Sequence, residues 1–399
     1  MSRKKGYEFE FIALMASLMS IVALSIDALL PALPEIGGYF NVENINDNQK
    51  MITMIFLGLG VGQLIFGPLS DSFGRKPIVY AGFVVFLIAS IICLSTKNFE
   101  IMIFGRVLQG IGLATFRTIS MSMIRDSYSG NFMAKIISIV VMVFLIVPII
   151  APTLGQLLLE FFDWQSIFYF NLFFGFIVVV WFWKRQPETL KSKYRIKFSP
   201  SLFIDGTKEF LKYKSAVAFT IVSGFITGSF MVYLSTAQQI FEHQYNLAEE
   251  FPIIFASLAI AIGLATYLNS KLVMRFGMWR LSFLAIIAYV LVSVLYIILF
   301  PQNNPSITVL ITFFSLQFFA IGFVFGNVRA LALQPLGHIA GIGAALNGFI
   351  STVMAVPIAN FIGSFIKTSV LPLFLGFFIT GIIGLILFYS VKKPVRVRG

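Results

Sequence analysis

Long apolar runs separated by short polar turns make up most of the chain. Leu281 to Phe300 and Val370 to Val391, for example, carry no charged side chain. A helix needs about 20 apolar residues to cross roughly 30 Å of hydrocarbon. The pattern therefore predicts an all-α polytopic membrane protein. Hydropathy and turn signals place twelve transmembrane helices at residues 9–32, 50–70, 77–95, 100–124, 134–159, 165–184, 214–238, 251–271, 280–300, 306–329, 340–365 and 369–391.

The twelve predicted helices form two pseudo-symmetric halves. We predict an N-terminal six-helix bundle over 1–184, a cytoplasmic linker loop over 185–213 and a C-terminal six-helix bundle over 214–399. The halves resemble each other weakly, because SDSFGRKP after the second helix and VMRFGMWR after the eighth both place Phe-Gly in a short basic turn. Paired six-helix repeats are common in secondary transporters, with substrate sites near the midplane. The basic linker is interpreted as a solvated, flexible tether, or alternatively as a segment on anionic lipid.

The positive charge of the chain reports its orientation in the membrane. Apolar residues make up 58% of the sequence and charged ones 12%, so a soluble protein could not cover its surface. Of the 29 basic residues, three lie in loops on one side (Lys50, Lys97 and Lys367), two lie within a helix (Arg106 and Arg117), and the remaining 24 lie on the other side. Basic residues collect in the cytoplasm, which predicts that both termini are cytoplasmic. The net charge of +12 then requires no nucleic-acid partner.

The sequence lacks the residues that several classes of chemistry require. Cys93 is the single cysteine, so no intramolecular disulfide can form, and His243 and His338 are too far apart in sequence to suggest a metal site. No nucleophile–base pair or phosphate-binding glycine loop is present, so we expect neither an enzyme, nor an ATP-driven pump, nor a cofactor. The N-terminal apolar run has no small-residue cleavage pattern and is interpreted as a retained first span. A membrane-embedded enzyme and a non-transporting sensor remain as alternatives.

The stretch GPLSDSFGRKPIV resembles the signature loop of the major facilitator superfamily. In that family the loop latches the two halves on the cytoplasmic side, together with an acidic residue at the end of the fourth span. The resemblance implies a cytoplasmic latch made of Gly67, Asp71, Gly74, Arg75, Lys76 and Asp126, with Leu69 also matching. We expect Gly67 to allow close helix approach and Gly74 to allow a tight turn. The basic residue usual after the aspartate is Ser72 here, and the alternative is that these charges only shape a turn.

Further motifs resemble the Bcr/CflA-type drug:proton antiporters along essentially the whole chain. GRVLQGIG matches their fourth span, VPIIAPTLGQLL resembles the antiporter motif at Pro148, Pro152 and Gly155, and QPLGHIAGIGAALNG resembles the same subgroup. The resemblance implies a monomeric, proton-coupled exporter of small amphipathic drugs in a bacterial inner membrane, working by alternating access. Its partners would be protons, a small-molecule substrate and the lipid bilayer.

The chain also departs from this subgroup at named positions. Ala151 and Gln156 replace two glycines of the antiporter motif, and Gln165 replaces an arginine at the start of the sixth span. Some relatives carry a second acid in the first span. The face of that span that leads to Asp27 has no second carboxylate, because it carries Ala23, Ser20 and Met19.

Ionisable groups inside hydrocarbon are costly and mark functional positions. Away from the ends of the spans, Asp27, Arg106 and Arg117 are such groups. Asp27 and Arg106 fall in the outer halves of their helices, so we predict that they couple proton movement to transport. Loss of water favours a protonated carboxyl, and a nearby cation favours a carboxylate. The alternative is a static Asp27–Arg106 pair that fixes helix packing, and Arg117 is expected to extend toward the cytoplasm.

The remaining predictions concern flexibility and the substrate. Pro148 and Pro152 are expected to distort the fifth span, with a plain kink as the alternative to a gating role. Substrate-cavity residues are guessed to be Gln109, Phe230, Tyr233, Gln238, Gln317 and Asn347. An apolar wall with sparse polar groups suits lipophilic, including cationic, drugs. The alternative on the same fold is a dedicated exporter of one metabolite or siderophore.

Overall fold

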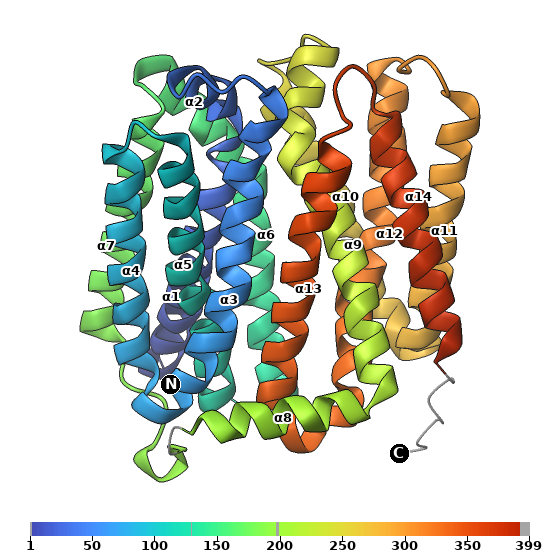
Figure 1. Cartoon of the computed structure of the whole chain (residues 1–399). Coiled ribbons are helices and arrows are strands. Elements are labelled where there is room, and N and C mark those ends of the chain that lie inside the picture. The colour runs from blue at the N-terminus through green and yellow to red at the C-terminus, as the bar shows by residue number, and fades with distance from the viewer. Residues whose placement is uncertain (1, 129, 197–198, 392–399) are drawn as a thin grey trace. The chain divides into compact units, whose positions relative to one another are not determined.

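The computed structural model describes residues 2–128, 130–196 and 199–391, and within them it is almost entirely helical (Figure 1). No strand occurs in these ranges. The predicted all-α class is therefore confirmed. Eleven helical segments are long and apolar enough to cross a membrane: Glu8–Tyr39, Ile45–Phe73, Arg75–Ser95, Phe99–Ser127, Gln165–Arg185, Lys214–Gln244, Phe251–Phe276, Met278–Leu299, Ile307–Leu336, Gly341–Gly363 and Leu371–Ser390.

The predicted span at 134–159 falls within helix α6 (Gly130–Phe161). Many side chains between residues 130 and 145 lie outside the described set, and the apolar helix described there is the shorter segment Ile146–Phe161. The helix continues through Pro148 and Pro152. The C-terminal basic residues after 391, used above to orient the chain, also lie outside the described ranges.

The first span is longer than predicted. Helix α1 (Ser2–Asp27) is followed by a short 3₁₀ turn, η1 (Leu30–Ala32), and by α2 (Leu33–Tyr39). Pro31 and Pro34 made the predicted helix stop near residue 32, but each proline sits in the first turn of a new helical segment. Proline is tolerated there because its missing N–H would have no intrahelical acceptor. Asp27 therefore lies where α1 ends, inside the longer span Glu8–Tyr39.

The chain divides into two compact units. Unit 1 comprises residues 1–199 with 247–256, and unit 2 comprises 200–246 with 257–399. In unit 1, α5 (Phe99–Ser127) packs against α3 (Lys50–Phe73), α4 (Arg75–Ser95) and α1, while α1 also packs against α6 and α7 (Gln165–Arg185). Helix α5 is therefore the central element of unit 1.

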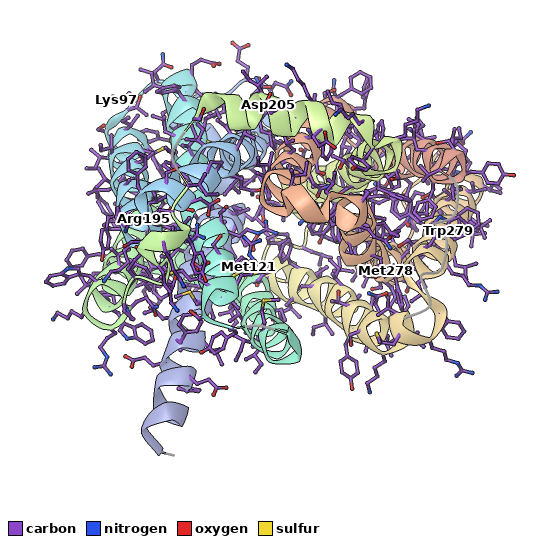
Figure 2. The ribbon with its side chains drawn as sticks, turned by 90° about the horizontal axis from the view of Figure 1, so that it is seen from below. Lys97, Met121, Arg195, Asp205, Met278 and Trp279 are labelled. Carbon is purple, nitrogen blue, oxygen red and sulfur yellow. The ribbon has the colours of Figure 1, made fainter. Side chains whose placement is uncertain are left out.

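Unit 2 is built around α9 (Lys214–Gln239). This helix packs against α12 (Ile307–Leu333), α13 (Ala340–Gly363) and α14 (Leu371–Ser390). Helix α11 (Met278–Leu299) covers α12 and α14, and it follows α10 (Phe251–Phe276). Helix α8 (Pro200–Lys212) lies across the ends of α9 and α13, where Asp205 is labelled in Figure 2.

The two Phe-Gly turns that suggested an internal repeat share one backbone feature. Gly74, between α3 and α4, has φ +105°, and Gly277, between α10 and α11, has φ +83°. This left-handed region is readily open only to glycine. They are the two positive-φ glycines of the described chain. The common conformation shows why each turn needs glycine after phenylalanine.

Two glycines bring α3 and α5 into backbone contact. A Cβ atom added at Gly58 would overlap the carbonyl oxygen of Val107, and one added at Gly110 would overlap that of Ile55. Small residues at such positions let helices pack closely within a membrane. The predicted close approach at Gly67 is wrong, because a Cβ there would meet Thr118 at an ordinary 3.9 Å.

Candidate functional site

Asp27 is the last residue of α1 and is buried, with a relative exposure of 5%. Within the described residues its carboxyl group has no hydrogen-bond donor and no ion-pair partner. A buried charge without a partner is costly, and in proteins such groups are usually paired or become neutral. The site therefore places a carboxyl group inside unit 1 with no cation bonded to it among the described residues.

Arg106, on α5, is 1% exposed and donates three hydrogen bonds to other groups. Its Nε donates to the carbonyl oxygen of Met51 at 2.8 Å, and its Nη2 donates to the carbonyl oxygen of Ser25 at 3.0 Å. Its Nη1 donates to Oε1 of Gln109 at 2.8 Å. The guanidinium thus joins α1, α3 and α5. The static Asp27–Arg106 ion pair, considered as an alternative from the sequence, is not formed.

Gln109 extends this network to a fourth helix. Its Nε2 donates to the hydroxyl of Ser90 on α4 at 2.7 Å, and the Gln109 side chain is 2% exposed. The Arg-x-x-Gln spacing places both side chains on one face of α5, since residues three apart are neighbours on a helix. Gln109 therefore orients Arg106 and is buried among helices of unit 1.

The antiporter-type motif of α6 meets the chain beside Asp27. A Cβ atom at Gly155 would overlap the carbonyl oxygen of Ala28, the residue that follows Asp27. The backbones of α6 and of the α1 end are therefore in direct contact there. Together, Arg106 bonded to Ser25 and Gly155 packed against Ala28 fix the backbone on both sides of Asp27.

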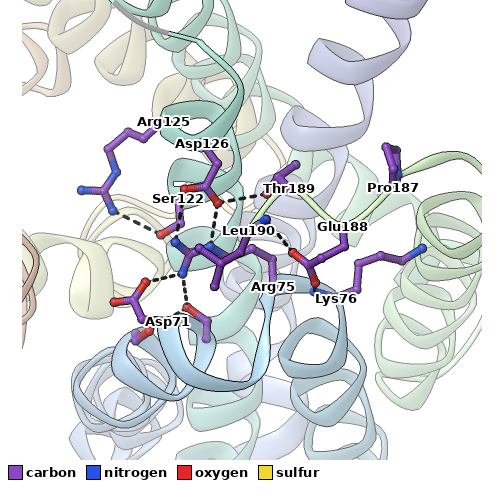
Figure 3. A network of polar contacts seen from close by, with 12 residues as sticks. Asp71, Arg75, Lys76, Ser122, Arg125, Asp126, Pro187, Glu188, Thr189 and Leu190 are labelled. Atoms are coloured by element: carbon purple, nitrogen blue, oxygen red, sulfur yellow. Dashed lines mark hydrogen bonds and ion pairs between the residues drawn. The ribbon is translucent and has the colours of Figure 1, made fainter. Parts of the chain in front are cut away.

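Asp71, Arg75 and Asp126, which we call the latch cluster, lie together at the ends of α3, α4 and α5 (Figure 3). Nε of Arg75 donates to Oδ2 of Asp126 at 2.8 Å, and Nη2 donates to Oδ1 at 3.3 Å. Nη1 donates to Asp71 and, at 2.7 Å, to the hydroxyl of Ser70. The side chains of Arg75 and Asp126 are 6% and 18% exposed, so their pair is largely shielded from water, whereas Asp71 is 41% exposed. All of these bonds join residues of unit 1.

The start of the linker completes the latch cluster, which the sequence did not reveal. The Glu188 carboxylate accepts a hydrogen bond from the backbone N–H of Lys76 at 3.0 Å, at the N-terminus of α4. The hydroxyl of Thr189 donates to Asp126 at 3.0 Å, and the N–H of Ile196 donates to the carbonyl of Asp71 at 3.1 Å. Negative charge is favoured at a helix N-terminus. The linker between Pro187 and Ile196 is thus bound to unit 1 and is not a free tether there. Figure 3 shows the bonds of Glu188 and Thr189.

Lys76, the last residue of the signature loop, does not pair with an acid among the described residues. Its Nζ donates to the carbonyl of Trp183 at 3.3 Å and lies 6.0 Å from the ring centre of Phe182. Lys76 therefore ties the start of α4 to the end of α7. Arg195, further along the linker, is labelled in Figure 2 at the same end of unit 1.

Most of the residues guessed to line a cavity contact other parts of unit 2. Tyr233 packs against Phe318 with ring centres 4.6 Å apart, and Phe230 packs against the same ring at 5.6 Å. Gln317 donates to Ser293, and Asn347 donates to Thr220 at 2.8 Å. Gln238 donates to Glu242. These bonds join helices or turns within the unit, and a role in a cavity stays a prediction.

The described side chains contain no group of three His, Cys, Asp or Glu residues placed to hold a metal ion. Cys93 is buried, and its thiol lies 3.8 Å from the carbonyl oxygen of Met102. The side chain of His338 lies outside the described set.

Comparisons with known proteins agree with this architecture. The family model of the Major Facilitator Superfamily matches residues 15–359. The chain is 28% identical over 396 residues to the uncharacterized MFS-type transporter YdgK of Bacillus subtilis, covering 97% of each protein. It is 27% identical over 273 residues to a bicyclomycin resistance protein homolog of Haemophilus influenzae, covering 67% of this chain and 68% of that protein.

Two further comparisons bear on part of the chain and on the fold. Over 166 residues, 41% of each protein, the chain is 31% identical to the multidrug resistance protein MdtL of Citrobacter koseri. The crystal structure of a D-xylose-proton symporter superposes over 98% of both chains with a TM-score of 0.73 at 13% identity, a likeness in fold alone. With a family model covering most of its length, the chain belongs to the Major Facilitator Superfamily and is a multi-span membrane transporter rather than an enzyme.

Proposed function

We propose that this protein is a proton-coupled secondary exporter of small amphipathic molecules. It would act as a monomer in a bacterial inner membrane with both termini in the cytoplasm, and α6 would be the twelfth span. Two six-helix bundles, 1–184 and 214–399, would alternate between outward and inward access, joined by the linker at 185–213. The relatives named for bicyclomycin and multidrug resistance support the class of substrate.

The observation that carries the proposal is the isolated carboxyl group of Asp27. It is buried at the end of α1 with no partner among the described residues, while Arg106 bonds to backbone carbonyls instead. A carboxylate in hydrocarbon is costly, and a proton is the simplest ligand that removes its charge. Asp27 would therefore carry the coupled proton.

The proposed cycle follows from exchange at this group. Facing outward, Asp27 takes up a proton and the substrate leaves. Facing inward, substrate binding favours release of the proton to the cytoplasm. A ligand shifts such an equilibrium only by its differential affinity for the two states, so substrate and proton must favour opposite charge states of the site. The latch cluster, with Glu188 and Thr189, would stabilise one of the two access states.

A toxicity panel in cells that lack their own exporters tests this function. Cells expressing the protein would be compared with empty-vector cells against cationic dyes, neutral amphipathic antibiotics and zwitterionic fluoroquinolones. We expect resistance to several compounds, abolished when the proton gradient is collapsed. Resistance to none, with the protein correctly inserted, would contradict multidrug export and favour a dedicated metabolite or siderophore exporter. Resistance that survives collapse of the gradient would contradict proton coupling.

A further inference from the structure

Arg117 is, after Arg106, the second cation that lies away from the ends of the spans described for unit 1. It lies on α5 eleven residues after Arg106. Eleven residues make about three turns, so both arginines share one face of the helix, about 16 Å apart along its axis. The Arg106 guanidinium makes three hydrogen bonds. The second arginine has a different environment.

The Arg117 side chain has no hydrogen bond, ion pair or aromatic partner among the described residues. It is partly exposed, whereas Phe116 and Ser120 beside it are fully buried. The Ser120 hydroxyl, one turn further on, also lacks a hydrogen-bond partner in the part of the chain that the structure describes. A charged group and a hydroxyl that both lack partners thus lie next to each other on α5.

The charge of Arg117 is not removed by loss of a proton, and it is not fully solvated by extension of the side chain toward the cytoplasm. An arginine guanidinium stays protonated in proteins. Ten residues, about 15 Å of helix, separate Arg117 from the end of α5 at Ser127, a longer distance than its side chain can extend. The expected extension of Arg117 to the cytoplasm is therefore not sufficient to solvate it fully.

The described residues of unit 1 provide no counterion for Arg117. Asp27 is the carboxylate well inside a span of the first half, and it lies near the level of Arg106, because Arg106 bonds to Ser25. In the second half, Glu242 is the one acidic residue within the described spans, and it lies two residues before the end of Lys214–Gln244. Sequence and structure together thus leave a permanent positive charge with no carboxylate bonded to it among the described residues.

We propose that Arg117 binds the carboxylate group of the transported substrate, which makes carboxylate-bearing amphiphiles, zwitterions included, the preferred substrate class. This inference rests on the proposed export function and names its substrate. A guanidinium presents a planar pair of donors that matches the two oxygens of a carboxylate. The loaded state then pairs a charge that the empty state leaves without a partner.

The experiment compares a fluorescent zwitterionic fluoroquinolone with its methyl ester, which lacks the anionic group. Export into buffer and direct binding would be measured for wild type, Arg117→Gln, Arg117→Lys and Arg280→Gln in phosphatidylcholine vesicles. Arg280 is an exposed arginine at the start of α11 and is the matched control. Insertion and folding of each variant would be checked by its unfolding midpoint.

We expect Arg117→Gln to weaken binding of the acid about tenfold or more, the loss typical of a charge-assisted hydrogen bond. Binding of the ester should not change, Arg117→Lys should keep part of the preference, and Arg280→Gln should match wild type. Equal loss of acid and ester in folded Arg117→Gln would show a structural role and overturn the inference. Unchanged preference for the acid would overturn it as well.

Two further outcomes distinguish a failure of the carboxylate site at Arg117 from a failure of the proposed export function. If wild type shows no proton-driven export but binds the acid through Arg117, the export function fails and the carboxylate site stands. If acid and ester bind alike, and Arg117→Gln alters only the response to added anionic phospholipid, the site holds a lipid phosphate and the inference is wrong.

Discussion

Arg106 donates a hydrogen bond to the backbone carbonyl of Ser25 at 3.0 Å and makes none to Asp27, two residues further along α1. The cation therefore holds the backbone that presents the carboxyl group without neutralising the group itself. Gly155 packs against the backbone carbonyl of Ala28, the residue that follows Asp27. In the proposed mechanism this arrangement keeps Asp27 fixed in position but free to gain and lose a proton.

Replacing Arg106 should destabilise unit 1 more than it changes substrate choice. Arg106→Gln leaves the buried carbonyls of Ser25 and Met51 without donors, and each hydrogen bond to a charged group contributes about 1.5–3 kcal/mol. We expect a clearly lower thermal unfolding midpoint in detergent, measured by scanning fluorimetry. Arg280→Gln, at an exposed position, is the control. An unfolding midpoint equal to that of wild type would show that these bonds contribute little.

Gly155 should tolerate no side chain. Gly155→Ala places a Cβ against the Ala28 carbonyl, so α6 must move away from the end of α1. Overpacking of this kind costs about 1–3 kcal/mol. Gly263→Ala, on α10, is the control, because nothing lies within 4 Å of its Cβ position. We expect slower transport and a lower unfolding midpoint only in Gly155→Ala, and equal behaviour of the two variants would contradict the contact.

The latch cluster should control access rather than substrate binding. Arg75→Gln removes donors to both Asp71 and Asp126. Arg125→Gln is its neighbour control, since Arg125 bonds to Ser122 on its own helix (Figure 3). We expect Arg75→Gln to shift cysteine accessibility at engineered positions on the two sides of the membrane and to lower the transport rate. The same accessibility in both variants would assign the cluster to local turn structure.

Tyr245 should make the free energy of unfolding of unit 2 depend on pH in the alkaline range. Its hydroxyl donates to the carbonyl of Pro305 at 2.9 Å, and burial raises the pKa of Tyr245 to about 12. An unfolded tyrosine ionises near pH 10, so between these values the folded state binds more protons and the free energy of unfolding falls as pH rises.

Tyr245→Phe tests this sign. At pH 8 the variant should unfold at a lower temperature than wild type, because it lacks a hydrogen bond that contributes about 1 kcal/mol. The difference should narrow at pH 11, where wild type loses its advantage. A difference that stays constant between the two pH values would show that Tyr245 does not titrate with unfolding.

Hydrophobic patterning was enough to predict the helical class and the approximate positions of most spans. It succeeded because hydrocarbon requires a continuous apolar run wherever a helix crosses. It misplaced the end of the first span, because prolines can begin a helix as well as end one. The pairs that Arg75 makes with Asp71 and Asp126 were also predictable. Asp71 lies four residues before Arg75, and Asp126 followed from the resemblance to the family, in which an acid at the end of the fourth span joins the loop.

Other parts of the site left no signal in the sequence. Arg106 bonds to backbone carbonyls, which every residue carries, so no side chain indicates its partners. Glu188 lies 112 residues from Lys76 in a loop whose composition suggested only solvation. The glycines that bring α3 and α5 together could not be distinguished from Gly67 without the facing helix. Long-range pairing of this kind depends on how helices pack.

The most direct test of the claim that Asp27 carries the coupled proton is to measure proton-driven export by the Asp27→Asn variant. Purified protein in vesicles would be given an imposed pH gradient, and both substrate movement and proton flux would be recorded. Asp163→Asn, at an exposed position before α7, is the matched control. We predict that Asp27→Asn folds and binds substrate but shows no substrate-coupled proton flux, while the control matches wild type. Full proton-driven export by Asp27→Asn would contradict the assignment of Asp27 as the proton carrier.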